Sequence, residues 1–162
     1  CLPEEEAAKP ITVRDCLADF RENYGSRWNA KTQPYAGITR LLSAVVANGM
    51  KLAVLSNKSQ EFTEKCVGYY LDQWKWDVVF GLQDGFPKKP NQAGAIEITR
   101  RLGVEPGECA LFGDTSVDME TASRAGMVGV GVLWGFRDEK ELRGAGAKIL
   151  LRKPQDYLNL PF

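Results

Sequence analysis

The stretch Ala110-Leu-Phe-Gly-Asp-Thr-Ser-Val-Asp-Met-Glu-Thr-Ala-Ser-Arg-Ala-Gly-Met127 decides the fold of this chain. The apolar run from Cys109 to Phe112 has no helical spacing, which is typical of a buried parallel strand ending at Gly113. From Val117 onward, small and apolar residues recur at helical spacing until Gly126, where a helix is expected to stop. The stretch therefore predicts a strand, an acidic turn and a helix in succession.

The same alternation continues in both directions along the chain. Strands are expected at 50–56, 78–80, 109–112, 128–133 and 148–151, and helices at about 38–47, 60–70, 91–102, 117–125 and 138–143. Strands and helices that alternate at this spacing predict an α/β fold with a doubly wound, parallel sheet and right-handed crossovers. A helix over about 12–24 stands outside the series and is followed by a polar connector. We therefore expect residues 1–33 to form a separate covering element and residues 34–162 to form the core domain.

The acidic turn places Asp114 and Asp118 at the carboxyl end of a parallel strand, where ligands bind in open α/β sheets. Two carboxylates there suit Mg²⁺, which takes one or two carboxylates and completes its shell with water and substrate phosphate. A purely structural interpretation competes with this one. Thr115 to Asp118 also matches a capping box, in which Asp118 only satisfies amide groups of the first helical turn.

Polar residues also follow the two preceding strands. Ser56 and Asn57 can hold a phosphoryl oxygen through a hydroxyl and a backbone amide, although either can instead simply cap the next helix. Pro90 fits the first turn of the helix expected at 91–102, which would place Lys89 at the amino terminus of that helix, beside the site. A lysine there can neutralise charge on a phosphoryl group in transfer, whereas Lys88 is expected to be solvated.

Bulk composition excludes several classes of function. The 162 residues carry 21 basic and 21 acidic side chains, so there is no net basic field to support nucleic-acid or membrane-surface binding. No apolar run is as long as a membrane span, and the first residues lack the basic and apolar regions of a signal peptide, so a cytoplasmic location is expected. The chain contains no histidine, which excludes Ser-His-Asp and Cys-His pairs and HExxH zinc sites. Any chemistry must use carboxylates, hydroxyls, lysine or a metal ion.

The stretches Leu55-Ser-Asn57, Lys89-Pro90 and Gly113-Asp-Thr-Ser-Val-Asp118 resemble the second, third and fourth motifs of the haloacid dehalogenase superfamily of phosphohydrolases. Flanking stretches resemble its phosphoglycolate phosphatase branch (31–38, 52–58 and Val132-Leu-Trp-Gly-Phe136). The resemblance covers the chain from about residue 15 to the end and implies a Rossmann-like core with the remnant of a helical cap.

The same resemblance assigns a role to each candidate site residue. It implies that Ser56 binds the phosphoryl group with the Asn57 amide beside it, and that Lys89 stabilises charge on nucleophile and phosphate. It further implies that Asp114 ligates Mg²⁺, and that Asp118 ligates the ion or orients its water.

One departure from the family pattern is decisive. The family's nucleophile is an aspartate in a DxDGT-like motif on the first strand, and this chain contains no Asp-x-Asp. We interpret the chain as the carboxyl-terminal part of a longer phosphatase. The family places the nucleophile strand between the strands ending at Ser56 and Gly113. We therefore expect the gap to be filled by an amino-terminal segment, by an element swapped from a second copy, or by direct pairing of the two strands.

The sequence thus predicts a Mg²⁺-dependent phosphatase that acts on a small phosphorylated substrate such as 2-phosphoglycolate. Its aspartyl-phosphate would form on the missing segment, so residues 1–162 alone should be inactive. A phosphomutase of the same fold is an alternative, whereas the paired acids argue against a dehalogenase. From a different class, the chain could be a non-catalytic fragment or a degenerate module that binds phosphate or partners.

Overall fold

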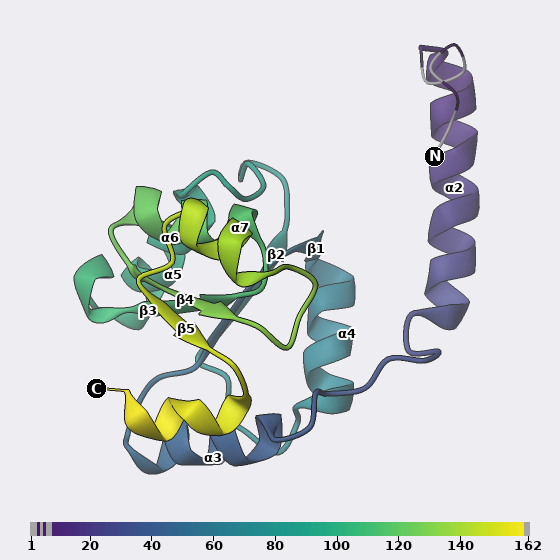
Figure 1. Ribbon diagram of the computed structural model, residues 1–162. Helices are drawn as coiled ribbons and strands as arrows, with labels where there is room; N and C mark the ends of the chain where they lie inside the picture. Colours follow the sequence, from purple (N-terminus) through teal and green to yellow (C-terminus); the bar gives the residue numbers. More distant parts are fainter. Residues whose placement is uncertain (1–2, 4, 6–7, 161–162) are drawn as a thin grey trace. The chain divides into compact units, whose positions relative to one another are not determined.

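A computed structural model describes residues 3, 5 and 8–160 of the chain (Figure 1). The chain divides into two compact units, Cys1–Gln33 and Pro34–Phe162. No helix in the described ranges is both long enough and apolar enough to cross a membrane.

The first unit contains α2 (Pro10–Arg27), which begins with proline at a first-turn position and is longer than the helix expected at 12–24. None of its residues is buried, and the rings of Phe20 and Tyr24 stack on its surface with centroids 5.4 Å apart. Its interpretation as the remnant of a cap stays a prediction.

The second unit alternates helices and strands in the order that the sequence predicts. Its elements are α3 (Ile38–Ala47), β1 (Ala53–Ser59), α4 (Gln60–Tyr70), β2 (Val78–Leu82), α5 (Ala93–Leu102), η1 (Pro106–Glu108), β3 (Ala110–Gly113), α6 (Ser116–Ala125), β4 (Val128–Val132), α7 (Glu139–Gly144), β5 (Ile149–Leu151) and η2 (Pro154–Asn159). All neighbouring strands pair in parallel, in the orders β1-β2 and β3-β4-β5. The α/β, doubly wound fold class is confirmed.

Helices cover both faces of the strands. On one face, Ile98 of α5 packs with Val78 and Phe80 of β2. On the other, α3 packs with Tyr157 of η2 in a core cluster that Leu52 and Phe112 also join. Figure 1 shows α5, α6 and α7 above the strands and α3 with η2 below them. Because Leu52 precedes β1 and Phe112 belongs to β3, one apolar core holds the two groups of strands together.

Two strand edges remain open inside this core. Alternate residues of a parallel strand direct their backbone groups to opposite edges. The Leu52 carbonyl accepts a hydrogen bond from the Asp77 amide and therefore points toward β2. The backbone N–H and C=O groups of Ala53 and Leu55 consequently point to the other edge of β1. The Cys109 carbonyl accepts a hydrogen bond from the Val128 amide and therefore points toward β4. By the same alternation, the backbone groups of Ala110 and Phe112 point to the opposite edge of β3.

The side chains of these strands are only half-buried. None of the residues 53–56 of β1 and 110–112 of β3 is fully buried, whereas four of the five residues of β4 are. In the described part of the chain β1 pairs only with β2 and β3 only with β4. We call the space between these two open edges the β1–β3 slot. Direct pairing of the two strands, one of the three outcomes expected from sequence, is therefore wrong.

Two predicted boundaries also need correction. The first strand begins at Ala53 rather than at residue 50 and continues through Ser59, with a register shift between Leu55 and Ser59. Helix α5 begins at Ala93, so Pro90 lies in the loop before the helix and not in its first turn. The Lys89–Pro90 peptide bond is cis, a conformation that suits a tight turn.

Candidate active site

The candidate site lies at the carboxyl ends of β1 and β3. Ser56 and Asn57 sit in the irregular part of β1, where the register with β2 shifts. The Ser56 hydroxyl oxygen accepts a hydrogen bond from the Lys58 amide at 3.1 Å, which leaves its own proton to donate. Ser56 therefore already has a local turn-forming role, and this role is compatible with donation to a phosphoryl oxygen.

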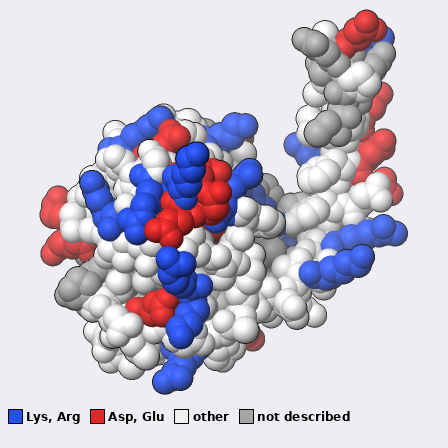
Figure 2. Space-filling model, in the orientation of Figure 1, with Lys and Arg blue, Asp and Glu red and all other residues white. Residues whose placement is uncertain are grey.

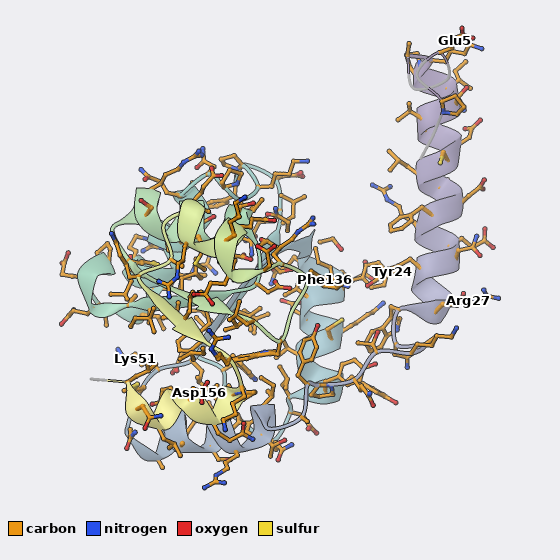
Figure 3. All side chains as sticks on the ribbon, viewed as in Figure 1. Glu5, Tyr24, Arg27, Lys51, Phe136 and Asp156 are labelled. Atoms are coloured by element: carbon orange, nitrogen blue, oxygen red, sulfur yellow. The ribbon has the colours of Figure 1, made fainter. Side chains whose placement is uncertain are left out.

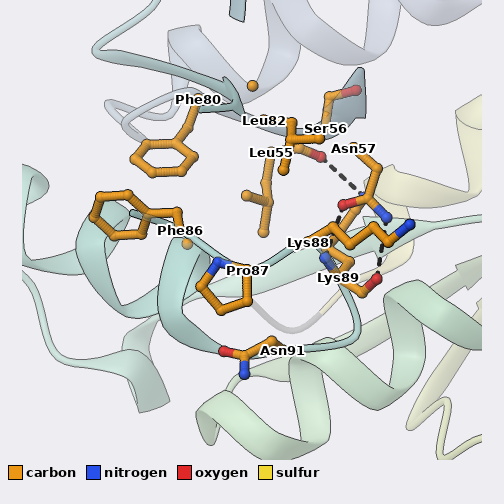
Figure 4. Close-up of a pocket in the computed structure, with 12 residues that line it drawn as sticks. Leu55, Ser56, Asn57, Phe80, Leu82, Phe86, Pro87, Lys88, Lys89 and Asn91 are labelled. Carbon is orange, nitrogen blue, oxygen red and sulfur yellow. Dashed lines mark hydrogen bonds between the residues drawn. The ribbon is translucent and has the colours of Figure 1, made fainter. Parts of the chain in front are cut away.

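The Asn57 side chain fixes the backbone of Lys89. Its Oδ1 accepts from the Lys89 amide at 2.7 Å, and its Nδ2 donates to the Lys89 carbonyl at 3.1 Å (Figure 4). The sequence predicts a role only for the backbone amide of Asn57. The side-chain role follows from the fold, which brings two residues 32 positions apart side by side.

Lys89 is the central cation of the site. Its Nζ donates to Asp118 Oδ1 at 2.7 Å and to the Leu55 carbonyl at 3.0 Å. The side chains of Lys89 and Asp118 are only 14% and 11% exposed. The Leu55 carbonyl belongs to the open edge of β1, so the ammonium group stands at the carboxyl end of the β1–β3 slot. By contrast, Lys88 is exposed, as its prediction as a solvated residue requires.

Asp118 has partners on both carboxylate oxygens. Oδ1 accepts from Lys89, and Oδ2 accepts from the Thr115 amide at 3.2 Å and from the Thr115 hydroxyl at 2.7 Å. The hydrogen bond from the Thr115 amide is the capping-box contact that the sequence offers as the alternative to metal binding by Asp118. Gly113 packs directly against this carboxylate, and a Cβ atom there would overlap it. Asp118 thus caps α6 and holds Lys89 at the same time.

Asp114 is half-buried and has a different environment. Its Oδ2 accepts from the Phe136 amide at 2.9 Å, and within the described ranges no group is bonded to Oδ1. Gly135 lies so close that a Cβ atom would overlap the Asp114 side chain. Two residues further along the turn, the Ser116 amide donates to Glu141 Oε1 at 3.2 Å. The site therefore includes the segment after β4.

A shallow hollow adjoins Ser56 and Lys89. It lies between the ends of β1 and β2 and the loop before α5, and Figure 4 shows Ser56, Lys89 and Phe86 on its rim. Phe86 packs edge to face on Phe80, with ring centroids 5.0 Å apart. The hollow gives the polar site one apolar wall.

The face of the core unit that is in view in Figure 2 carries charges of both signs. Figure 2 shows basic and acidic side chains interspersed on the face of the core unit that is in view, with no continuous basic field.

Burial raises the pKa of the Cys109 thiol, with a further contribution from Glu108. Cys109 is therefore disfavoured as a thiolate nucleophile at the start of β3.

The donor set fits one carboxylate ligand for Mg²⁺ better than two. Asp114 offers a hard oxygen without a protein partner, whereas both oxygens of Asp118 have partners. No group of three or more acidic, Cys or His residues that could hold a metal exists among the described residues. A Mg²⁺ ion here would depend on water, substrate phosphate and a ligand from outside these residues.

Comparison with known proteins agrees with this arrangement. The chain is 31% identical over 156 residues to phosphoglycolate phosphatase of Aquifex aeolicus. The matched region covers 96% of this chain and 72% of that protein. It is 26% identical over 152 residues to pyrophosphatase PpaX of Halalkalibacterium halodurans, over 93% of this chain and 70% of that protein. A solved Lactobacillus delbrueckii protein described as a candidate phosphoglycolate phosphatase superposes with a TM-score of 0.85 at 30% identity, over 96% of this chain and 64% of that one.

The fold and the site together define an α/β protein with a polar cluster of Ser56, Lys89, Asp114 and Asp118 at the carboxyl edge of its parallel strands. The sequence profile of the haloacid dehalogenase-like hydrolases matches residues 2–132, and the chain belongs to that family. The resemblance to phosphoglycolate phosphatases is confirmed. The chain spans between 60% and 72% of the length of the phosphoglycolate phosphatases from Xylella fastidiosa and Aquifex aeolicus that it matches.

Proposed function

We propose that this chain provides the phosphoryl-binding and cation-binding part of a Mg²⁺-dependent phosphatase that acts on a small phosphomonoester, with 2-phosphoglycolate as the first substrate to test. The observation that carries the proposal is the nearly buried Lys89–Asp118 pair at the carboxyl end of the open β1 and β3 edges. A cation held there by two acceptors is positioned before substrate arrives, which is the form of electrostatic stabilisation that costs least reorganisation.

Each described residue has a task in the proposed reaction. The Ser56 hydroxyl and the Asn57 amide donate to phosphoryl oxygens, and Lys89 offsets the negative charge that develops during transfer. Asp114 holds the cation through its free oxygen, and Asp118 keeps Lys89 in place. Mg²⁺ would supply charge neutralisation at the phosphoryl oxygens.

The nucleophile is proposed to be an aspartate outside residues 1–162. Its carboxylate oxygen attacks phosphorus, the bond to the substrate oxygen breaks, and the leaving oxygen takes a proton from a water molecule and departs as the alcohol. Water then hydrolyses the aspartyl-phosphate and releases inorganic phosphate. Splitting the reaction in this way replaces one difficult step by two easier ones.

The β1–β3 slot supports a position for that aspartate. β1 runs parallel to β2 and β3 runs parallel to β4. Both open edges leave alternate backbone groups without a strand partner, and both are lined by half-buried apolar residues of β1 and β3. An extended segment parallel to both would pair with the two edges and end beside Lys89. An element from a second copy of the chain is the alternative occupant, and the mass of the assembly distinguishes the two.

The test compares residues 1–162 with the same chain extended by whatever coding sequence precedes it in its gene. With Mg²⁺ and 2-phosphoglycolate, only the extended protein should release inorganic phosphate. Peptide mapping of the trapped intermediate should find the phosphoryl group on a peptide outside residues 1–162. Turnover by the unextended chain, abolished by Ser56→Ala or Asp114→Asn, would contradict the proposal. With a sugar phosphate in place of 2-phosphoglycolate, an isomerised product without released inorganic phosphate would instead indicate a phosphomutase, and inactivity of both proteins would indicate a non-catalytic module.

A further inference from the structure

The segment that follows β4 reaches back to the acidic turn by two separate contacts. The Phe136 amide donates to Asp114 Oδ2 at 2.9 Å, and Glu141 Oε1 accepts from the Ser116 amide at 3.2 Å. The first of these contacts joins residues 22 positions apart in the chain. The turn that carries Asp114 is therefore held from the side by Phe136, whose stretch the sequence marked only as similar to a family branch, and by Glu141, which belongs to no motif.

The contact with Asp114 is made by backbone and not by side chain. The Phe136 residue is 82% exposed, and Figure 3 shows its side chain at the edge of the core unit, on the loop between β4 and α7. Its amide nonetheless occupies Oδ2 of Asp114, while Oδ1 has no partner within the described ranges. A carboxylate with one oxygen fixed by a donor has its plane set and presents the other oxygen in one direction.

Gly135 supplies the room for this geometry. A Cβ atom at residue 135 would overlap Cβ, Cγ and Oδ2 of Asp114, so any larger residue must displace the carboxylate or the loop. Gly144, at the end of α7, has no heavy atom within 4 Å of the equivalent position. The two glycines therefore form a matched pair for substitution by alanine. The added Cβ atom is crowded at residue 135 and lies in open space at residue 144.

We propose that the Gly135–Phe136 turn is a positioning element that orients Asp114, with the Phe136 amide holding Oδ2 and Gly135 leaving space for the carboxylate, so that Oδ1 faces a divalent cation. The inference rests on the proposed function, because it assigns Asp114 to cation binding. It adds residues whose effect acts through Asp114 and not through contact with substrate.

Backbone amide resonances of the isotope-labelled chain of residues 1–162 provide the first test. Loss of the hydrogen bond should speed exchange of the Phe136 amide about tenfold in Asp114→Ala and in Gly135→Ala. Asp114→Asn, which retains a carbonyl acceptor, and Gly144→Ala should leave the rate close to that of the unsubstituted chain. Phe136→Ala should also preserve slow exchange at residue 136, because the amide remains. Equal exchange rates in all of these proteins would overturn the inference.

Mn²⁺ alone serves as the probe of cation binding. In the extended protein without substitutions, Mn²⁺ should broaden the Thr115 amide signal, and Gly135→Ala in that protein should raise the concentration needed for half-broadening roughly tenfold, as loss of an orienting partner does at metal sites. Gly144→Ala should need the same concentration as the unsubstituted extended protein. Identical titrations for Gly135→Ala and Gly144→Ala, or no broadening of Thr115, would overturn the inference. Neither readout needs turnover, so a failed phosphatase assay leaves this result standing on its own.

Discussion

Lys89 Nζ lies 2.7 Å from Asp118 Oδ1 and 3.0 Å from the carbonyl oxygen of Leu55, so a single ammonium group joins two separate groups of paired strands. Leu55 belongs to β1, which pairs with β2, whereas Asp118 lies in the first turn of α6, the helix that follows β3. This bridge stands at the end of the β1–β3 slot. Lys89 thus contributes to the stability of the core and to the charge of the site.

Lys89→Met should lower the free energy of unfolding by about 3 kcal/mol, because it leaves the nearly buried Asp118 carboxylate without its cation. Lys88→Met is the matched control, since the neighbouring lysine is exposed, and it should stay within about 0.5 kcal/mol of the unsubstituted chain. Urea unfolding of both proteins measures the difference. The reverse ranking would show that the lysine at the site has been misassigned.

The two aspartates should separate stability from cation binding. Asp118→Asn loses the charge that pairs with Lys89 and should cost about 2 kcal/mol of stability. Asp114→Asn keeps an acceptor for the Phe136 amide and should cost under about 1 kcal/mol. In the extended protein, however, Asp114→Asn should depress turnover by several orders of magnitude. Stability losses of equal size, or an active Asp114→Asn protein, would be inconsistent with this division of roles.

Asn57→Ala should weaken the site through Lys89. The substitution removes both hydrogen bonds that tie the Lys89 backbone to β1, at an expected cost of about 1 to 2 kcal/mol. In the extended protein it should lower kcat more than it raises KM, because Lys89 acts mainly on charge that develops in the transition state. A change in KM alone would assign Asn57 to ground-state substrate binding instead.

Outside the site, Glu97 gives a prediction about pH. Hydrogen bonds from Arg100 and then Arg101 lower the pKa of Glu97 to about 2. A carboxylate with a depressed pKa in the folded state stabilises the protein above its unfolded pKa and loses that contribution as the pH falls toward about 2. Titration of the Glu97 carboxyl resonance should give this low pKa, and Arg100→Gln should raise it. An ordinary carboxyl pKa in the unsubstituted chain would refute the network.

Local signals in the sequence were sufficient for most of the fold. The acidic turn after β3 and the helix stop at Gly126 were recognised because residue type alone constrains them. The start of α5 was not, since Pro90 is also compatible with a loop before the helix. The boundary of β1 was missed because apolar residues continue on both sides of Ala53.

The candidate site was only partly predictable for a related reason. Ser56, Lys89, Asp114 and Asp118 carry distinctive side chains, and they are brought to one edge by the predicted topology. The Leu55 carbonyl, the Asn57 side chain and the Phe136 amide participate through tertiary contacts that residue type does not reveal. Two signals point to Gly135 and Phe136: they follow a strand whose carboxyl end meets the same edge, and their stretch resembles the phosphoglycolate phosphatase branch, but neither signal indicates a contact with Asp114.

Hydrogen exchange at the edges of the β1–β3 slot tests the central claim most directly. In residues 1–162 alone, the amides of Ala53, Leu55, Ala110 and Phe112 should exchange quickly, whereas those of Val54 and Leu111, which face β2 and β4, should be protected. In the extended protein all six should be protected, because a strand that carries the nucleophile pairs with both edges. Fast exchange at the four slot amides in an extended protein that hydrolyses 2-phosphoglycolate would contradict the account.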